Sequence, residues 1–202
     1  MMKTKKLLAK DFITIGLYTI LIFIVQTIVN MIMTPFTAVA MPYISGTSLF
    51  VTSLVYMLMA IRVGKGGTLF FMAIVQGLIY TLMGAPLMLP FFAIAGLLGE
   101  LTLIKGNGSQ YRNVSRQGLA FGLYGAIYGT GGVMNIYVFG KESLDTMQFS
   151  PETIDRMVSY AYSPIWLSIG IAFSFMMAMI GCHLSKKLLN KHFIKSGYIQ
   201  YH

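Results

Sequence analysis

Charged side chains are scarce in this chain of 202 residues. Asp, Glu, Lys and Arg together make up 10% of it, whereas hydrophobic residues make up 56%, and the mean hydropathy is +0.71. So little polar surface excludes an ordinary soluble domain. Uncharged stretches cover residues 12–61, 66–99, 117–140 and 157–185. The composition therefore predicts an integral membrane protein.

Residues that carry enzyme chemistry are also few. The single cysteine, Cys182, excludes an intrachain disulfide and is interpreted as a packing residue. The sequence contains no HExxH, GxSxG or GxxxxGK[ST] motif. The Gly-rich stretch 64–67 lacks the leading glycine and the Ser/Thr of a phosphate loop, so we interpret it as a tight turn. We expect no catalytic residue, metal ligand or cofactor; energy for transport would come from an ion gradient or from a partner subunit that hydrolyses ATP.

The apolar runs are long enough for several membrane helices, each of which needs roughly 20 residues. Breaks are predicted at Thr34-Pro35 together with the cluster 42–48, and again across 84–90. This predicts an all-α membrane protein of one domain, residues 1–202, with spans at about 12–33, 43–61, 67–84, 88–104, 117–139 and 163–186. The third and fourth spans are short, so a re-entrant hairpin is the alternative there.

Positive charge is distributed unevenly over the connections between these spans. Thirteen of the fifteen Lys and Arg residues fall in the two terminal segments and in the connections after spans two and four. Only Lys141 and Arg156 fall on the opposite side. Because cytoplasmic segments retain Lys and Arg, both termini are predicted to be cytoplasmic in a multi-pass protein.

Negative charge gathers in the long outer loop, since residues 129–157 hold four of the six acidic residues. Within it, Ser150 followed by Pro151 predicts a short helix over about 151–161. The same Ser-Pro pair at 163–164 predicts the start of span six. Glu100 is the one acid inside a predicted span, and we interpret it as snorkelling or paired with Lys105 rather than as a proton relay.

Small residues recur at helical spacing in the last two spans. Span five has them at 118, 122, 125 and 129, and span six at 170, 174, 178 and 182. Such rows let helix backbones approach closely. We interpret them mainly as packing within the chain, with an interface to a partner as the alternative.

Uncharged polar and aromatic side chains crowd the outer half of the predicted spans. The candidate ligand-binding residues are Gln26, Asn30, Tyr43, Gln76, Tyr80, Tyr128, Asn135, Tyr162 and Trp166. Amides that orient a ligand and aromatics that cover it are typical of a small-molecule pocket. The alternatives are a structural amide network and an aromatic belt. We expect a pocket roofed by 35–42 and 84–90, with 141–157 as a lid; Asn135 is the strongest single candidate, because the glycines before it loosen the helix.

Several features together carry a family resemblance. They are the basic start KTKKLLAKDFITIGLYTILIFIV, the third-span sequence QGLIYTLMGAP, six spans in about 200 residues, and the long outer loop. The chain resembles the substrate-binding S component of energy-coupling factor (ECF) transporters, and among these the Trep_Strep or MptD-type family. The resemblance implies a bacterial cytoplasmic-membrane protein that captures a vitamin-like or other small organic micronutrient from outside.

The same resemblance implies the partners. These would be one ECF coupling transmembrane subunit and two ATPase subunits, besides membrane lipid and the small-molecule ligand, with no nucleic acid. Two alternatives of other classes are a stand-alone carrier or channel acting as a homo-oligomer, and a membrane scaffold that transports nothing.

Overall fold

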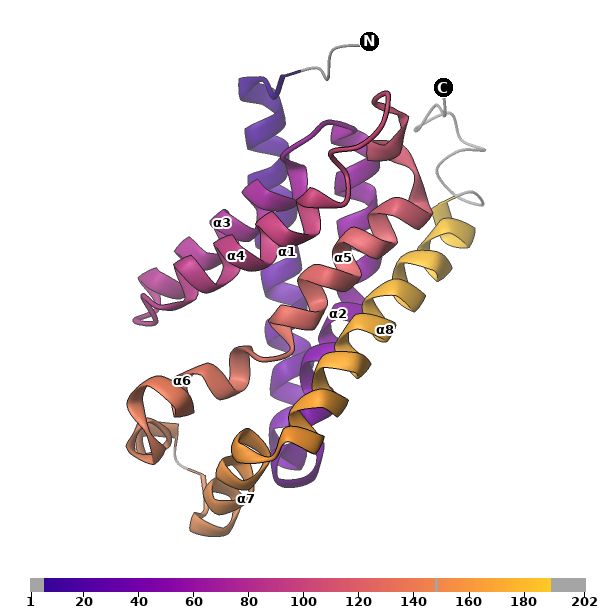
Figure 1. Ribbon diagram of the computed structural model, residues 1–202. Coiled ribbons are helices and arrows are strands. Elements are labelled where there is room, and N and C mark those ends of the chain that lie inside the picture. Colours follow the sequence, from indigo (N-terminus) through magenta and orange to yellow (C-terminus); the bar gives the residue numbers. More distant parts are fainter. Residues whose placement is uncertain (1–5, 148, 190–202) are drawn as a thin grey trace.

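Helices make up the secondary structure of the computed structural model, which describes residues 6–147 and 149–189 (Figure 1). In chain order the elements are α1 (Ala9–Met33), the 3-10 helix η1 (Thr34–Phe36), α2 (Thr37–Val63), α3 (Thr68–Leu82), α4 (Met88–Leu101), η2 (Ser109–Arg112), α5 (Val114–Tyr128), α6 (Gly131–Phe139), η3 (Lys141–Met147), α7 (Pro151–Tyr162) and α8 (Pro164–Leu189). The predicted all-α class is confirmed for these ranges.

Three long helices, α1, α2 and α8, form the frame of the bundle. They have 25, 27 and 26 residues, and at 1.5 Å per residue each exceeds the roughly 30 Å of a bilayer core. Two apolar stretches, Ala9–Val63 and Pro164–Leu189, are long and apolar enough to cross a membrane. The turn at η1 folds the first of these stretches into the α1–α2 hairpin seen in Figure 1.

The second long helix begins earlier than the sequence predicts, at Thr37 rather than at about residue 43, and Pro42 lies inside it. A proline inside a helix removes the N–H that would bond to the carbonyl four residues back, here that of Ala38. The Tyr160 hydroxyl donates a hydrogen bond to this carbonyl oxygen at 3.2 Å. This hydrogen bond reduces the energetic cost of the proline. Because α2 is continuous from Thr37 to Val63, the predicted break across 42–48 is wrong, and the chain turns at 34–36 instead.

The predicted fifth span, 117–139, is also not continuous. Helix α5 ends at Tyr128 and α6 begins at Gly131. At Gly129 the backbone lies against α8, because a Cβ there would be 3.2 Å from the Gly170 carbonyl oxygen. Beyond this point α6 runs away from α8 in Figure 1. The glycine cluster therefore ends one helix and lets the chain change direction, as the sequence suggested.

Helix α8 packs against both α2 and α5 through its small residues. A Cβ on Gly181 would lie 2.8 Å from the Phe50 carbonyl oxygen of α2. On the other side, a Cβ on Gly125 of α5 would lie 3.2 Å from the Ala178 Cβ. Gly125, Ala178 and Gly181 are all buried. The interpretation of these rows as packing within the chain is confirmed.

Helices α3 and α4 form a hairpin of 15 and 14 residues, or about 22 Å each. Their backbones approach at Gly77, where a Cβ would lie 2.9 Å from the Leu89 Cα. Both helices are shorter than a full span requires, so the crossing of the membrane by this hairpin stays a prediction beside its re-entrant alternative.

Glu100 has a different partner from the one predicted. Its carboxylate accepts hydrogen bonds from the backbone N–H groups of Gly67 at 2.6 Å and Leu69 at 3.1 Å. Among the described residues no ion pair joins it to Lys105. The acid thus caps the amino terminus of α3, where unpaired N–H groups attract negative charge.

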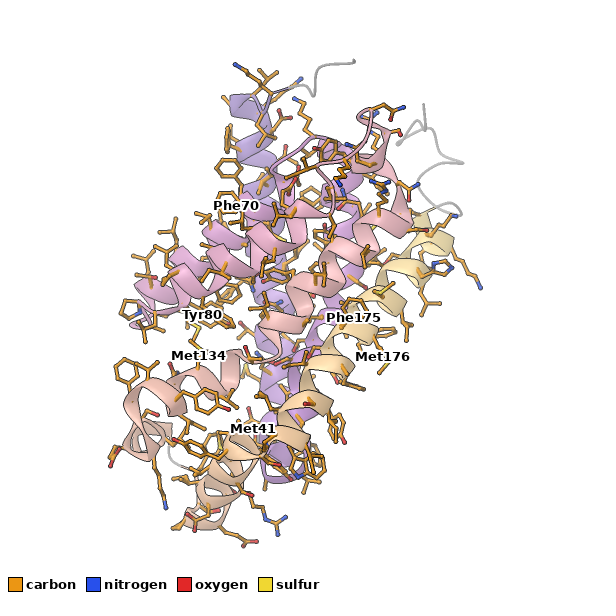
Figure 2. The ribbon with its side chains drawn as sticks, viewed as in Figure 1. Met41, Phe70, Tyr80, Met134, Phe175 and Met176 are labelled. Carbon is orange, nitrogen blue, oxygen red and sulfur yellow. The ribbon has the colours of Figure 1, made fainter. Side chains whose placement is uncertain are left out.

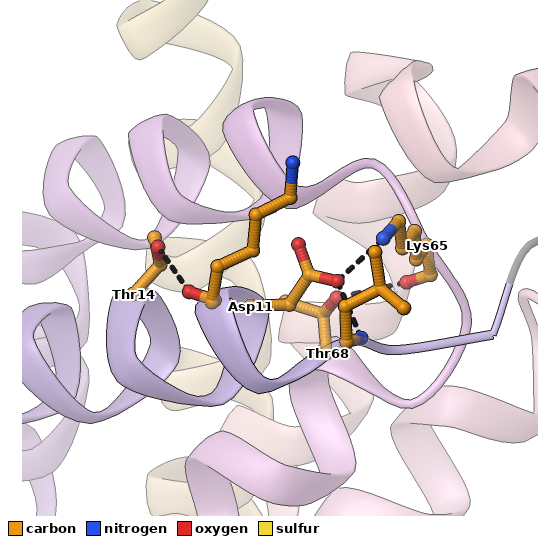
Figure 3. Close-up of polar contacts among 6 residues, drawn as sticks. Asp11, Thr14, Lys65 and Thr68 are labelled. Carbon is orange, nitrogen blue, oxygen red and sulfur yellow. Dashed lines mark hydrogen bonds and ion pairs between the residues drawn. The ribbon is translucent and has the colours of Figure 1, made fainter.

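The segments predicted to be cytoplasmic lie together at one end of the bundle in Figure 1, and α7 lies at the other. At the first end, Asp11 pairs with Lys65 of the α2–α3 turn and accepts a 2.7 Å hydrogen bond from the Leu8 N–H (Figure 3). The turn itself has the expected tight form, with Gly64 and Gly67 at positive φ. The predictions for Lys3, Lys5 and residues 190–202 lie outside the described residues, and the side of the membrane that each end faces stays a prediction.

Candidate ligand-binding site

A cavity of about 370 Å³ lies where three chain reversals or breaks meet. Its lining comes from the α1–α2 turn region, the α3–α4 connection, the α5–α6 break, and the segment that joins α6 to α7. The volume falls in the range of small-molecule pockets, which are about 300–1,000 Å³. The cavity is therefore the candidate ligand-binding site.

One wall of the cavity is aromatic. Tyr80 of α3 stacks on Phe92 of α4 with ring centroids 5.4 Å apart, and Phe92 lies 5.8 Å from Tyr128 of α5. Phe91 meets Phe92 edge to face at 5.6 Å. Since each ring is held by a neighbour, these four side chains, from three helices, form a preorganised surface for an apolar ligand.

Two asparagines supply amide groups to the lining. The Asn30 Oδ1 of α1 accepts a hydrogen bond from the Ser48 hydroxyl at 2.8 Å, which fixes its orientation. Asn135 of α6 is half-buried, and its side chain makes no hydrogen bond within residues 6–147 and 149–189. Because an amide has two donors and an acceptor, Asn135 retains its full capacity to bind a polar group.

Four of the nine predicted ligand-binding residues line this cavity: Asn30, Tyr80, Tyr128 and Asn135. The predicted roof contributes as well. Thr37 and Met41 come from the 35–42 region, and Ala85 and Met88 from 84–90. These placements bring the residues together around one space; binding of a ligand there stays a prediction.

Gln26 and Gln76 form a buried amide network, which was the alternative interpretation of the polar residues in the predicted spans. The Gln76 Nε2 donates to the Gln26 Oε1, and the Tyr124 hydroxyl donates to the Gln76 Oε1 at 2.9 Å. Neither glutamine lines the cavity. The Gln26 Nε2 has no partner among the described residues. These two amides therefore tie α1, α3 and α5 together next to the cavity.

The remaining three candidates lie elsewhere. Tyr43 meets Phe173 of α8 edge to face at 5.1 Å. Tyr162 is 63% exposed and its ring contacts Tyr137. Trp166 lines a separate, smaller cavity of about 40 Å³. The sequence predicted the helices that carry these residues but not the face of each helix on which they lie.

The segment formed by α6, η3 and α7, here called the cap segment (131–162), covers one side of the cavity with Leu144, Phe149 and Met157. It has its own small hydrophobic cluster, separate from the core of the bundle. Its buried members are Val133, Ile136, Leu144, Ile154, Met157 and Ala161. Helix α7 is capped as predicted, because the Ser150 hydroxyl accepts from the Thr153 N–H at 3.3 Å.

Some residues that line the cavity were not predicted from the sequence. Ile44 and Ser45 lie within the predicted break at 42–48, whereas the helix is continuous there and turns them to the cavity. Phe91 and Phe92 carry no signal that distinguishes them from other aromatics in an apolar run. No group of three His, Cys, Asp or Glu side chains gathers in the described ranges.

Comparison with known protein families shows a match over most of the chain. A family described as a hypothetical bacterial integral membrane protein (Trep_Strep) matches residues 9–195. No curated protein and no solved structure matches the chain. The family match covers nearly the whole sequence and agrees with the apolar helices Ala9–Val63 and Pro164–Leu189. The chain therefore belongs to the Trep_Strep family of bacterial integral membrane proteins.

Proposed function

We propose that this protein is the substrate-binding S component of an ECF-type importer. It would take up a small organic micronutrient from outside and pass it inward while partner subunits hydrolyse ATP. The observation that carries the proposal is the cavity of about 370 Å³, which combines an aromatic wall with the amides of Asn30 and Asn135. A pure scaffold has no need of such a site.

The position of the cavity supports capture from outside. It lies away from the end where the Gly64–Gly67 turn and the Asp11–Lys65 pair are found, and α7 of the cap segment lies at the opposite end (Figure 1). With the basic end in the cytoplasm, as the charge distribution predicts, the cap segment would face the outside. The ligand would then enter from the extracellular side.

The energy source supports a partnership. The sequence has no phosphate-binding loop of its own. Glu100, the acid inside the fourth predicted span, accepts hydrogen bonds from the backbone at the start of α3, which favours a structural role over that of a proton relay. Uphill transport by this chain would therefore depend on ATPases in other subunits, reached through a coupling subunit in the membrane.

The test is uptake in cells that make the protein together with its coupling subunit and ATPases. A mass-spectrometric survey of molecules that co-purify with the protein first supplies the ligand to be labelled. Uptake should stop when the ATPases are catalytically dead, and the protein should co-purify with all three partner chains. Uptake that continues with dead ATPases would instead establish a stand-alone carrier.

A pair of variants links uptake to the cavity. Asn135→Leu removes the unpaired amide from the lining, and we expect at least a tenfold loss of uptake at low ligand concentration, a change of about 1.4 kcal/mol in binding. Val138→Leu, on an exposed position of the same helix, is the matched control and should transport normally. Equal uptake by both variants would remove the cavity from the proposal.

A further inference from the structure

The lining of the cavity contains no charged side chain. Its described members include none of Asp, Glu, Lys, Arg or His. An ion that enters such a site loses its hydration without gaining a counter-charge, and this costs far more than the burial of a neutral polar group. The lining therefore selects against ligands that carry a net charge.

Helix ends do not supply the missing charge, because they meet at the cavity in opposed pairs. Thr37, Met88 and Gly131 line it at or next to the starts of α2, α4 and α6, whereas Asn30, Tyr80 and Tyr128 line it near the ends of α1, α3 and α5. The amino terminus of a helix carries about half a positive charge and the carboxyl terminus about half a negative one. The two contributions offset each other, so the pairs favour neither a cation nor an anion.

The shape and chemistry of the walls favour a flat ring. Tyr80 and Phe92 present stacked rings, and Tyr128 adds a ring tilted against Phe92. Met41, Met88 and Met157 add flexible thioethers, which make favourable contacts with aromatic rings. Figure 2 shows Tyr80 and Met41 coming from different helices around this space. Rings bind well between such surfaces.

Asn30 and Asn135 supply the polar part of the site. Asn30 uses its oxygen on Ser48, which leaves its Nδ2 as a donor, whereas Asn135 offers both donors and an acceptor. A ligand group that donates and accepts at the same edge, such as a carboxamide or a ring lactam, satisfies both. A carboxylate could only accept, and an amidinium could only donate.

We propose that the ligand of this cavity is an uncharged aromatic or heteroaromatic molecule with a carboxamide-like edge, which Asn135 and Asn30 bind. This inference rests on the proposed function only in requiring that the cavity binds a ligand; it does not depend on the partners or on ATP.

Three probes of nearly the same shape but different charge test the proposal: benzamide, benzoate and benzamidinium. Binding of each to the full chain in lipid nanodiscs is measured by calorimetry at neutral pH, at up to about 10 mM because fragments of this size bind weakly. Benzamide should bind at least tenfold more tightly than either ion. Equal or tighter binding of an ion, or no binding of any probe, would overturn the proposed ligand class.

A charge change in the site sharpens the test. Asn135→Asp keeps the shape of the side chain but adds a negative charge, so benzamidinium should become the preferred probe, by at least tenfold over benzamide. Asn107→Asp, at an exposed position in the α4–α5 connection, is the matched control and should keep the preference of the unchanged protein. An unchanged preference in Asn135→Asp contradicts the placement of the ligand edge at this residue.

The result separates the two proposals. If the protein prefers benzamide but its uptake does not depend on the ATPases, the ligand class is upheld and the S-component function is rejected. If uptake depends on ATP but the protein prefers an ion, the S-component function is upheld and the ligand class is rejected.

Discussion

The α2–α5–α8 interface and the region around the cavity are adjacent parts of one bundle, yet they are built in opposite ways. At the interface, Gly125 and Gly181 let backbones approach so closely that a single Cβ would collide. Around the cavity, large side chains from four parts of the chain leave a space of about 370 Å³. Small residues close the first region, and large residues keep the second region open.

The difference shows where the fold keeps its rigidity. Helix α8 fixes α2 and α5 along most of their length, and these two helices then fix the positions of Asn30's neighbour Ser48 and of the Tyr128 ring. The cap segment, by contrast, joins the bundle through the break at 129–130 and the turn at Ser163. A rigid frame with a separately packed cover suits a site that must open and close.

The two ends of the bundle should differ completely in access from outside the cell, which is the largest effect we expect. Cysteine introduced by Ser143→Cys, in the cap segment, should react with a membrane-impermeant thiol reagent in intact cells. Cysteine introduced by Asn107→Cys, in the connection at the basic end, should react only after the membrane is opened. The native Cys182 is fully buried, so background labelling should be low.

The reverse labelling pattern would invert the predicted orientation. Labelling of both positions in intact cells would show that the ends do not lie on opposite sides of the membrane at all. Either outcome would also move the proposed entry route of the ligand.

The close interface should be far less tolerant of added volume than the lipid-facing surface. Gly181→Ala places a Cβ 2.8 Å from the Phe50 carbonyl oxygen, which cannot rotate away, and we expect a loss of about 3 kcal/mol in stability. Gly16→Ala is the matched control, because a Cβ there meets nothing within 4 Å. The midpoint of thermal unfolding in detergent measures both. Equal midpoints would show that α2 and α8 can move apart freely.

The buried ion pair at the basic end should contribute more to stability than the exposed ion pair in the cap segment. The Asp11 and Lys65 side chains are only 10% and 13% exposed, so Asp11→Asn leaves a poorly hydrated ammonium and should cost about 2 kcal/mol. In the cap segment, the Glu152 and Arg156 side chains are 78% and 51% exposed, and Glu152→Gln should cost about 0.5 kcal/mol or less. Thermal unfolding of the two variants compares them; a larger effect at Glu152 would contradict the comparison.

The sequence predicted the frame better than the site, for physical reasons that particular residues show. Long apolar runs predicted α1 and α8 to within three residues at each end, and small residues at helical spacing predicted close packing of α5 and α8 within the chain. The break predicted at Pro42 is wrong, because the Tyr160 hydroxyl that replaces the missing helical donor is 118 positions away in the chain and could not be foreseen. Gln26 and Asn30 lie one turn apart on α1, but only the helix phase decides that one joins a network and the other lines the cavity.

The smallest effect that we predict comes from one hydrogen bond between the cap segment and the start of α2. The Tyr160 hydroxyl of the cap segment donates to the Ala38 carbonyl oxygen at 3.2 Å, and Pro42 leaves that oxygen without its usual helical donor. Tyr160→Phe should weaken closure of the cap segment by about 1 kcal/mol. Amide hydrogen exchange over 149–162 should become about fivefold faster as a result. Tyr162→Phe, on the same helix but with its ring exposed, is the matched control and should leave exchange unchanged.

Pro42→Ala tests the cause of this effect. An alanine N–H at position 42 can bond to the Ala38 oxygen within α2, as in any regular helix turn, so that oxygen no longer depends on Tyr160. Tyr160→Phe should then accelerate exchange less in the Pro42→Ala background than in the native chain, because the two changes act on one acceptor and are not additive. If the two changes act independently, the proline has no part in holding the cap segment, and its place inside α2 needs another explanation.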